Sequence, residues 1–346
     1  MKVLVIGGTG FIGPHLARRL NALGHELVLF HRGQTRAELP PGVAEIEGDR
    51  DQLRDQAERL RALRPDVVLH MLAMSERHGR DLMETFRGAA GRVVAISSQD
   101  VYLPYGRLWK VEPGPPVPVP LDEDGPLRTV LFPHKDATSP IFRKWRRELQ
   151  EYDKILVERA VMGDPELPGT VVRLPAVHGP GDPQHRLADL LKRMDDGRPA
   201  IVLDARRARW RWSRGYVEDV AHAIALAVAD ERATGRTYNV AWPTAFTETE
   251  WIRRVGEAAG WRGEVVALPT AQLPAHLVPD TDPSYDWVVD TSRIRRELGY
   301  AEVVPFDEAL RRTIAWERAN PPDEIDLANF DYAAEDRALA AAASGA

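Results

Sequence analysis

A glycine-rich turn directly after a short apolar segment constrains the fold of this chain most strongly. Val3-Leu4-Val5-Ile6 is followed by Gly7-Gly8-Thr9-Gly10-Phe11-Ile12-Gly13 and then by an amphipathic stretch over residues 14–23. This order predicts a strand, a tight turn and a helix. Glycine at positions 7 and 10 lets the backbone turn sharply and approach a ligand, and glycine at position 13 lets the helix pack close to the strand.

Such a turn is typical of a dinucleotide-binding site. The free amides and the positive dipole at the start of a helix attract a pyrophosphate group. Glycine turns also occur without a ligand, but here the strand and the helix that the motif requires are both present. The candidate cofactor contacts of this turn are Gly7, Thr9, Gly10, Phe11, Ile12 and Gly13.

The residues after the second apolar segment bear on the choice of cofactor. Residues 26–30 read as a strand that ends in His31-Arg32. An acidic residue there would bind the ribose hydroxyls of NAD, whereas an arginine pairs with the 2′-phosphate of NADP. Neither position 31 nor 32 is acidic, and Arg36 follows closely, so we expect NADP(H) to be favoured over NAD(H). The alternative is that Arg32 is a solvated loop cation.

Composition narrows the class of protein. The chain has 346 residues, which suits about two domains, and a formal net charge of -6, which argues against nucleic acid or an anionic membrane as the main partner. No long uncharged apolar run occurs, so we expect no membrane span, and the early first strand leaves no room for a signal peptide. Without cysteine, disulfides and thiolate chemistry are excluded, and the cytoplasm is the simplest location.

Strands and helices continue to alternate along the chain. Residues 43–47, 66–73 and 92–96 read as strands, and residues 51–63 read as a charged helix. This pattern predicts an α/β fold with a doubly wound parallel Rossmann sheet. Further cofactor candidates follow these strands, namely Asp49, Arg50, Leu72 and Ala73. Asp49 suits either an adenine amino group or the cap of a helix, and the two interpretations have equal weight.

Several later motifs resemble the extended short-chain dehydrogenase/reductase superfamily, and within it the NAD(P)-dependent epimerase/dehydratase family. Together with the glycine turn and the segment Asp290 to Tyr300, they cover the chain from residue 1 to about 318. The motifs are Ser97-Ser98-Gln99-Asp100-Val101-Tyr102, Lys154-Ile155-Leu156-Val157-Glu158, the segment 172–182, the segment 214–221, and Tyr238-Asn239-Val240. The resemblance implies a Rossmann domain with a smaller carboxy-terminal α/β lobe, and hydride transfer on a nucleotide-sugar-like or other hydroxyl or carbonyl substrate.

The same resemblance suggests domain boundaries. We expect residues 1–172 and 214–241 to form the Rossmann domain, and residues 173–213 and 242–320 to form the substrate lobe. Residues 321–346 are acidic and then alanine-rich, which predicts a terminal tail that frays. The oligomeric state is left open, with a homodimer as one outcome.

The resemblance also implies a catalytic tyrosine, a lysine that lowers the pKa of that tyrosine, and a serine on the substrate oxygen. Lys154 and Ser98 occupy matching positions, but Gln150 stands where the family has its tyrosine, four residues before the lysine. Tyr152 is only two residues before Lys154, and in a regular helix it would point about 200° away around the axis.

Three interpretations of this departure stay open. Tyr152 is the base if the helix is irregular or starts later than in the family. Another phenol, Tyr102 or Tyr105, takes its place. The third is that the protein binds the dinucleotide without ordinary hydride transfer and serves as an RNA-binding, protein-binding or regulatory protein. The alternative to a catalytic role for Tyr152 is that its ring packs against neighbouring helices as an ordinary amphipathic residue.

Two later segments supply candidates near the substrate. Residues 206–214 form the densest cationic run, and Arg209, Arg211 and Arg214 suit a substrate diphosphate. Stacking of RNA bases and a solvated strand edge are the alternatives. Pro175 and His178 follow the sixth strand, where relatives hold the nicotinamide, and His178 is either an acid-base group or a turn residue. No histidine pairing has zinc spacing, so we expect no metal.

The connection between Ser98 and Lys154 is long and rich in proline from residue 104 to residue 140. Such composition favours extended, stiff structure. A connection of this length is usually functional or disordered, and we expect a lid or wall over the substrate site rather than a mobile insertion.

Overall fold

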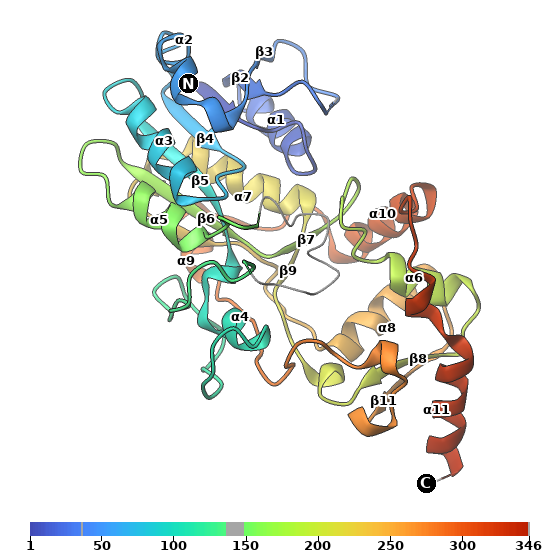
Figure 1. Cartoon of the computed structure of the whole chain (residues 1–346). Coiled ribbons are helices and arrows are strands. Elements are labelled where there is room, and N and C mark those ends of the chain that lie inside the picture. Colours follow the sequence, from blue (N-terminus) through green and yellow to red (C-terminus); the bar gives the residue numbers. More distant parts are fainter. Residues whose placement is uncertain (36, 136–148, 345–346) are drawn as a thin grey trace.

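A parallel sheet forms the centre of the molecule. The computed structural model describes residues 1–35, 37–135 and 149–344, and Arg36 therefore lies outside the described residues. Within them, seven strands hydrogen bond in the order β10-β6-β5-β4-β1-β2-β3 (Figure 1). The strands are β1 Lys2–Ile6, β2 Glu26–His31, β3 Ala44–Glu47, β4 Val67–His70, β5 Arg92–Ser98, β6 Gly169–Leu174 and β10 Thr237–Asn239. This order confirms the predicted doubly wound Rossmann sheet.

Both faces of the sheet are buried, as the apolar strands require. In β1, Val3 and Val5 belong to one core cluster, whereas Leu4 and Ile6 belong to another on the opposite face. Successive side chains of a strand point to opposite faces, and a parallel sheet is covered on both. The continuous apolar run that starts the chain is explained by this double burial.

Helices cover the two faces in two groups. α1 Gly13–Ala22 packs with α7 Val217–Ala229 on one face, and α3 Glu76–Phe86 packs with α5 Lys154–Met162 on the other. The expected helix over 51–63 is shorter. It consists of the turns Arg50–Gln52 and Arg54–Gln56, followed by α2 Ala57–Arg61.

A smaller α/β lobe lies beyond the carboxyl ends of the strands (Figure 1). Two short parallel pairs form its strands, β7 with β9 and β8 with β11. Their bounds are β7 Ala176–His178, β8 Ala200–Asp204, β9 Arg214–Tyr216 and β11 Glu264–Leu268. The main helices of the lobe segments are α6 Ala188–Asp195, α8 Glu248–Ala259, α9 Ser292–Leu298 and α10 Phe306–Ala319. α9 contacts β10 and α7, so the lobe is joined to the sheet at more than one place.

The carboxy-terminal segment is ordered, which contradicts the predicted fraying tail. α11 Tyr332–Ser344 packs on the lobe through Glu335, whose side chain is fully buried. Glu335 pairs with Arg193 at 3.0 Å and with His276 at 3.1 Å. These partners lie far away in the sequence, so composition alone gives no sign of the anchor.

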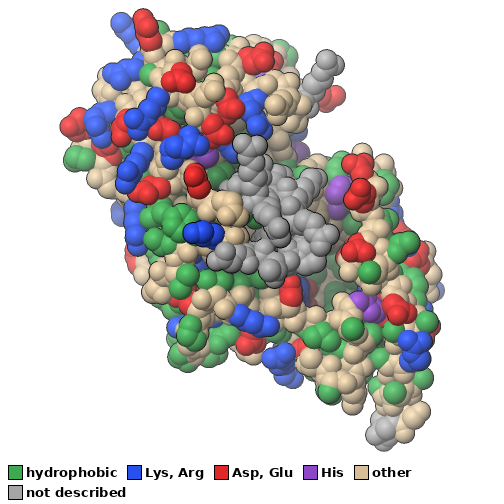
Figure 2. Space-filling view, in the orientation of Figure 1, with side chains coloured by type: hydrophobic (Ala, Val, Ile, Leu, Met, Phe, Trp, Pro, Cys, Tyr) green, Lys and Arg blue, Asp and Glu red, His purple; other side chains and the backbone are tan. Residues whose placement is uncertain are grey.

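Charges of both signs are interspersed on the surface over α2 and α3 (Figure 2). Arg54 pairs with Asp81 at 2.5 Å, and Arg77 reaches both Asp51 and Asp81. This mixing keeps the local field small. Among the described residues, no helix is both long and apolar enough to cross a membrane.

Candidate active site at the carboxyl ends of the strands

The glycine turn after β1 has the geometry that a bound pyrophosphate requires. Gly7 and Gly8 adopt φ values of +89° and +96°, which favour glycine. A Cβ atom on Gly13 would lie 2.0 Å from the carbonyl oxygen of Gly8, so the start of α1 packs against the turn itself. A Cβ atom on Gly10 would meet no heavy atom within 4 Å, which leaves the turn open on that side.

The remaining residues of the turn are half-buried around this opening. Thr9, Phe11 and Ile12 are partly exposed, and Ile12 is the N-cap residue directly before α1. Phe11 lies beside Gly181, at the start of the substrate lobe. An open cradle at the start of a helix fits the phosphates of a dinucleotide.

The residues on the adenosine side lie at the ends of β2, β3 and β4. Arg32 is exposed, and its side chain forms no ion pair within the described part of the chain. The carboxylate of Asp49 accepts a hydrogen bond from the amide of Asp51, so it caps the first turn after β3. Arg50 donates to the carbonyl oxygen of Leu72, a residue that is 44% exposed. The capping interpretation of Asp49 is thus realised, while its second oxygen is not used in that cap.

Lys154 is the first residue of α5 and lies at the centre of the site. The helix begins there because the side chain of Asp153 accepts from the amide of Ile155. The Lys154 ammonium donates to the carbonyl oxygens of Ala73 at 2.6 Å and Ile96 at 3.0 Å. Burial lowers its pKa to about 8. Two of its three hydrogens are used in these bonds, which leaves a donor suited to a ribose hydroxyl.

Tyr152 precedes this helix, so the angular argument for a regular helix does not apply to it. Its hydroxyl donates to Asp100 Oδ2 at 2.5 Å and also shares a hydrogen bond with Ser98. The Lys154 ammonium lies 5.9 Å from the centre of its ring. Gln150 instead lies on the surface, where its amide donates to the carbonyl oxygen of Lys135. The structure therefore brings Ser98, Tyr152 and Lys154 together.

The two other candidate phenols are engaged elsewhere. The Tyr102 hydroxyl donates to Asn239 Oδ1 at 2.8 Å and accepts from Arg173 at 2.9 Å, deep in the core. Tyr105 shares a 3.3 Å hydrogen bond with His134. Burial raises the pKa of Tyr102 to about 12. Tyr102 therefore joins the connection to the sheet and is poorly placed to act as a base.

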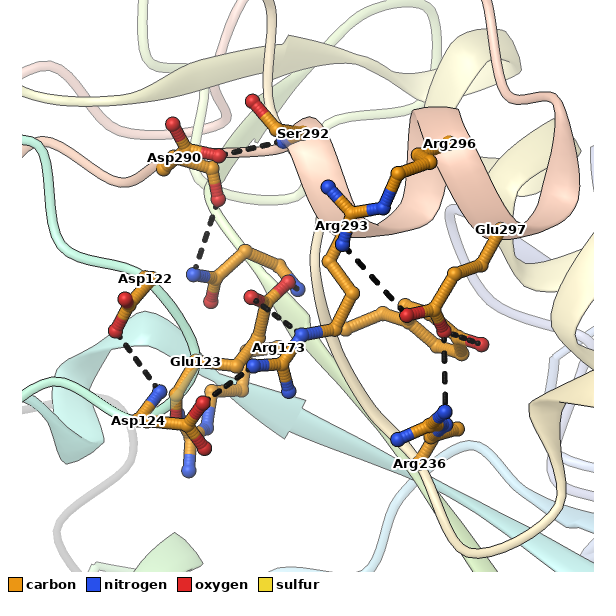
Figure 3. Close-up of polar contacts among 12 residues, drawn as sticks. Asp122, Glu123, Asp124, Arg173, Arg236, Asp290, Ser292, Arg293, Arg296 and Glu297 are labelled. Atoms are coloured by element: carbon orange, nitrogen blue, oxygen red, sulfur yellow. Dashed lines mark hydrogen bonds and ion pairs between the residues drawn. The ribbon is translucent and has the colours of Figure 1, made fainter.

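The described part of the long connection packs against the rest of the protein. Its α4, Leu103–Leu108, follows β5 after the short turn Gln99–Val101, and Leu121 packs in a core cluster with Tyr102 and Val289. The backbone oxygen of Glu123 accepts from Arg173, and its carboxylate pairs with Arg293 at 3.2 Å (Figure 3). Residues 136–148, also part of the predicted lid or wall, lie outside the described residues.

His178 is buried and packs as an aromatic residue. Its ring lies 4.8 Å from that of Trp242 and 5.5 Å from that of Trp251, and Nδ1 shares a 3.2 Å hydrogen bond with Thr313. Burial, reinforced by Arg214, lowers its pKa to about 3, so it stays neutral at physiological pH. These contacts favour the interpretation as a hydrogen-bonding residue over an acid-base group. Pro175, between β6 and β7, is partly exposed.

Carboxylates already pair with two of the three candidate arginines. Arg211 binds Asp286 at 2.7 Å on the surface, and Arg214 binds Glu248 at 2.8 Å while buried between Trp212 and Trp251. Arg209 is exposed, and no ion pair links it to the described residues.

A family comparison matches this arrangement. The sequence profile of the NAD dependent epimerase/dehydratase family matches residues 3–102 and 150–241. The chain belongs to this family. It is an NAD(P)-dependent enzyme of the epimerase, dehydratase or reductase type, as the motifs predicted. The matched segments contain the glycine turn, Ser98, Tyr152 and Lys154.

Individual relatives and structures agree with this assignment. The 2′-dehydrokanamycin reductase of Streptomyces kanamyceticus is 29% identical over 304 residues, covering 85% of this chain and 75% of that protein. The dTDP-6-deoxy-L-talose 4-dehydrogenase of Kitasatospora kifunensis is 27% identical over 339 residues, covering 90% and 93%. The UDP-glucose 4-epimerase of Thermus thermophilus, solved with NAD, is similar with a TM-score of 0.61 and 26% identity, covering 92% of this chain and 100% of that one.

Asp100 is the site residue to which the sequence interpretation gave no role. It stands two residues after Ser98 in a motif that was otherwise used, and an acidic residue just past the end of a central strand is a usable signal. Among the described residues, no group of acidic and histidine side chains is arranged to hold a metal ion.

Proposed function

We propose that the protein is an NADP(H)-dependent oxidoreductase that interconverts a hydroxyl and a carbonyl group on a sugar-like small molecule. The observation that carries this proposal is the meeting of Ser98, Tyr152 and Lys154 at the carboxyl ends of β4 and β5. This meeting occurs although the family's tyrosine position is occupied by Gln150, so a proton-transferring phenol is still available.

Each of the three residues has a distinct task in this proposal. A bound nicotinamide supplies or accepts the hydride at the substrate carbon. Tyr152 gives a proton to the substrate oxygen or takes one from it, and Ser98 hydrogen bonds to the same oxygen. Lys154 donates to the nicotinamide ribose with the hydrogen that its two carbonyl partners leave free.

The substrate class is argued from relatives and from the lobe. The relatives include a 2′-dehydrokanamycin reductase, a dTDP-glucose 4,6-dehydratase and a dTDP-6-deoxy-L-talose 4-dehydrogenase. A nucleotide sugar needs cations for its diphosphate, and Arg209 together with the buried Arg214 are the cations that we propose for that contact. A glycoside without phosphate needs neither, so the two substrate types make different demands on Arg209.

A turnover screen tests the function. The purified protein is incubated with NADPH and, in turn, 2′-dehydrokanamycin, a dTDP-linked 4-keto sugar and a UDP-linked 4-keto sugar, while absorbance of the reduced ring is followed. We expect oxidation of NADPH with at least one of these, and its loss in Tyr152→Phe. NADPH binding without turnover of any substrate would favour the rival role of a dinucleotide-binding protein without redox activity.

Arg32 is proposed to select NADP(H), because it is exposed beside the adenosine end of the turn and carries no ion pair with the described residues. Arg32→Asp should weaken NADPH binding by about tenfold or more and leave NADH binding equal or stronger, since a carboxylate repels the 2′-phosphate and accepts from ribose hydroxyls. Calorimetric titration with both cofactors measures this. Arg59→Asp, on the exposed face of α2, is the control and should change neither. Unchanged NADPH affinity in Arg32→Asp would refute the assignment.

A further inference from the structure

Asp100 lies behind Tyr152, in the short turn that follows β5. Its Oδ2 accepts the Tyr152 hydroxyl at 2.5 Å, and its amide donates to Ser98 Oγ at 3.2 Å. The side chain is buried, and its Oδ1 has no hydrogen-bond partner within the described part of the chain. A buried carboxylate oxygen without a partner is costly as an anion, so this environment favours a proton on Asp100.

Within residues 1–35, 37–135 and 149–344, no charged group that faces Asp100 forms a close ion pair with it. Arg128 donates through Nε to the backbone oxygen of Asp100 and through Nη1 to that of Val130, and its remaining contact is with Asp153 at 3.5 Å. Burial is the largest effect and raises the pKa of Asp100. Arg128, the hydrogen bond from Tyr152 and Lys154 lower it, Asp153 raises it, and the net shift is upward. Tyr105 faces the same carboxylate and is itself buried.

Lys154 does not offset this effect at the phenol. Its ammonium donates to two backbone oxygens and lies over the Tyr152 ring at 5.9 Å, and no hydrogen bond joins it to the Tyr152 hydroxyl. Burial and Asp100 raise the pKa of Tyr152 well above its ordinary value. A phenol in this state keeps its proton, so a free phenolate is not the form from which Tyr152 can start as a base.

We propose that Asp100 is a positioning residue that exchanges a proton with Tyr152 in each turnover, so that the tyrosine acts as a relay between the substrate oxygen and this carboxyl group. The inference rests on the proposed function above. It replaces the lysine-stabilised phenolate with a Tyr–Asp pair as the source and sink of the proton.

The proton balance can be written for both directions. In reduction, the substrate carbon receives the hydride, the substrate oxygen takes the proton of the Tyr152 hydroxyl, and the phenol oxygen regains a proton from the Asp100 carboxyl group. In oxidation, the substrate hydroxyl gives its proton to Tyr152 Oη while the phenol proton passes to the Asp100 carboxylate. After product leaves, water in the vacated site returns or removes the proton through Tyr152.

This relay predicts that the rates of reduction and oxidation depend on pH in opposite directions; each such rise or fall of a rate with pH is called a limb below. Reduction needs a proton on the pair and should slow as pH rises through its apparent pKa, whereas oxidation needs the pair deprotonated and should speed up over the same range. Both limbs should share one apparent pKa, because it belongs to the pair and not to either residue.

The test uses Asp100→Asn, with Asp122→Asn as the matched control. Asp122 lies on the surface of the same connection, and its Oδ1 accepts from the amide of Asp124, a bond that asparagine retains. Without cofactor, ultraviolet titration against a Tyr152→Phe reference reports when Tyr152 ionises. We expect Asp100→Asn to lower that pH by about one unit or more, since a negative charge is removed, and Asp122→Asn to leave it unchanged.

Turnover in both directions completes the test, with the substrate that the screen identifies. Asp100→Asn should abolish both limbs and slow reduction by about 100-fold, with little change in NADPH affinity. An unchanged ionisation of Tyr152 and unchanged limbs in Asp100→Asn overturn the relay while the proposed function stands. A coupled ionisation without turnover of any substrate overturns the proposed function and the catalytic use of the relay. If Asp100→Asn does not fold, parallel limbs in the wild-type protein overturn the relay, and opposite limbs with one apparent pKa support it.

Discussion

Lys154 shows at the scale of one residue how burial sets the chemistry of the site. Its ammonium is held by two carbonyl oxygens in the interior, and its pKa is about 8. Above that pH the group loses its charge and part of its donor capacity, so the affinity for NADPH should decline as pH rises through about 8. Lys154→Met should bind NADPH at least tenfold more weakly, because it loses a charge-assisted hydrogen bond, and its NADPH affinity should show no such decline with pH.

Calorimetric titration across the pH range measures this decline. Lys192→Met is the control, because Lys192 pairs with Asp196 on the surface of α6 and should leave the NADPH affinity unchanged. A decline that survives in Lys154→Met would assign it to another group.

Lys154 and Ser98 could be located from sequence because each has a fixed place relative to a strand or helix motif. The location of Tyr152 could not, because it depends on where α5 starts. Asp153 caps that helix and also accepts from the backbone amide of Phe132 at 2.7 Å, a residue of the distant connection. A contact of that kind is set by tertiary structure, which local periodicity does not contain.

At the scale of the elements, the glycine turn separates the needs of folding from those of binding. Gly13→Ala places a Cβ atom 2.0 Å from the Gly8 oxygen, so the turn must move, and both the melting temperature and the NADPH affinity should fall. Gly10→Ala meets no atom within 4 Å, so the unliganded melting temperature should stay unchanged while NADPH binding weakens.

Thermal unfolding with and without NADPH distinguishes the two variants of the turn. Unimpaired binding in Gly10→Ala would mean that the phosphates do not lie on that side of the turn.

The helix α11 was not predicted from the sequence, which indicated a fraying tail over residues 321–346. Glu335 is fully buried between Arg193 and His276. Glu335→Ala leaves the Arg193 charge unpaired in the interior and should lower the free energy of unfolding by about 3–5 kcal/mol. Asp336→Ala, one residue further on, removes a surface ion pair with Arg198 and should lower the free energy of unfolding far less. Urea unfolding compares them, and equal losses would contradict the anchoring role of Glu335.

At the scale of the whole molecule, three buried histidines, His70, His134 and His178, should lower stability in acid, and burial lowers the pKa of His70 well below its ordinary value. Burial lowers the pKa of His134 to about 4 and that of His178 to about 3. The unfolded chain takes up these protons near pH 6.5, whereas the folded protein does not. Stability is therefore full above pH 6.5 and falls as pH drops toward 4, by up to about 1.4 kcal/mol per pH unit for each histidine.

Urea unfolding between pH 7 and 4 measures this loss. Replacing His134 and His178 with glutamine should make the dependence less steep and leave the part due to His70, and His178→Gln alone should leave the parts due to His70 and His134. An equally steep loss in the double variant would move the cause to other groups.

The sheet and its two helical faces were predictable because the alternation of apolar strands with helices, and the glycine turn between the first pair, are patterns local in sequence. The long-range anchors were not: Glu335 lies 142 residues from Arg193, and the long connection reaches α9 through Glu123 and Arg293. The division into residues 1–172 with 214–241 and residues 173–213 with 242–320 remains a proposal. Contacts of α9 with β10 and α7 cross that division.

The late start of α5 also bears on how members of this family are sorted into active and inactive. Scoring a sequence by a tyrosine four positions ahead of the lysine assumes that both stand on one helix. In this chain, Gln150 lies on the surface before the helix begins. The substitution Gln150→Tyr would therefore place a second tyrosine ring on the surface, away from the Lys154 ammonium. The absence of tyrosine at that position therefore indicates where the helix begins. A survey that interprets this absence as loss of activity would exclude chains of this kind.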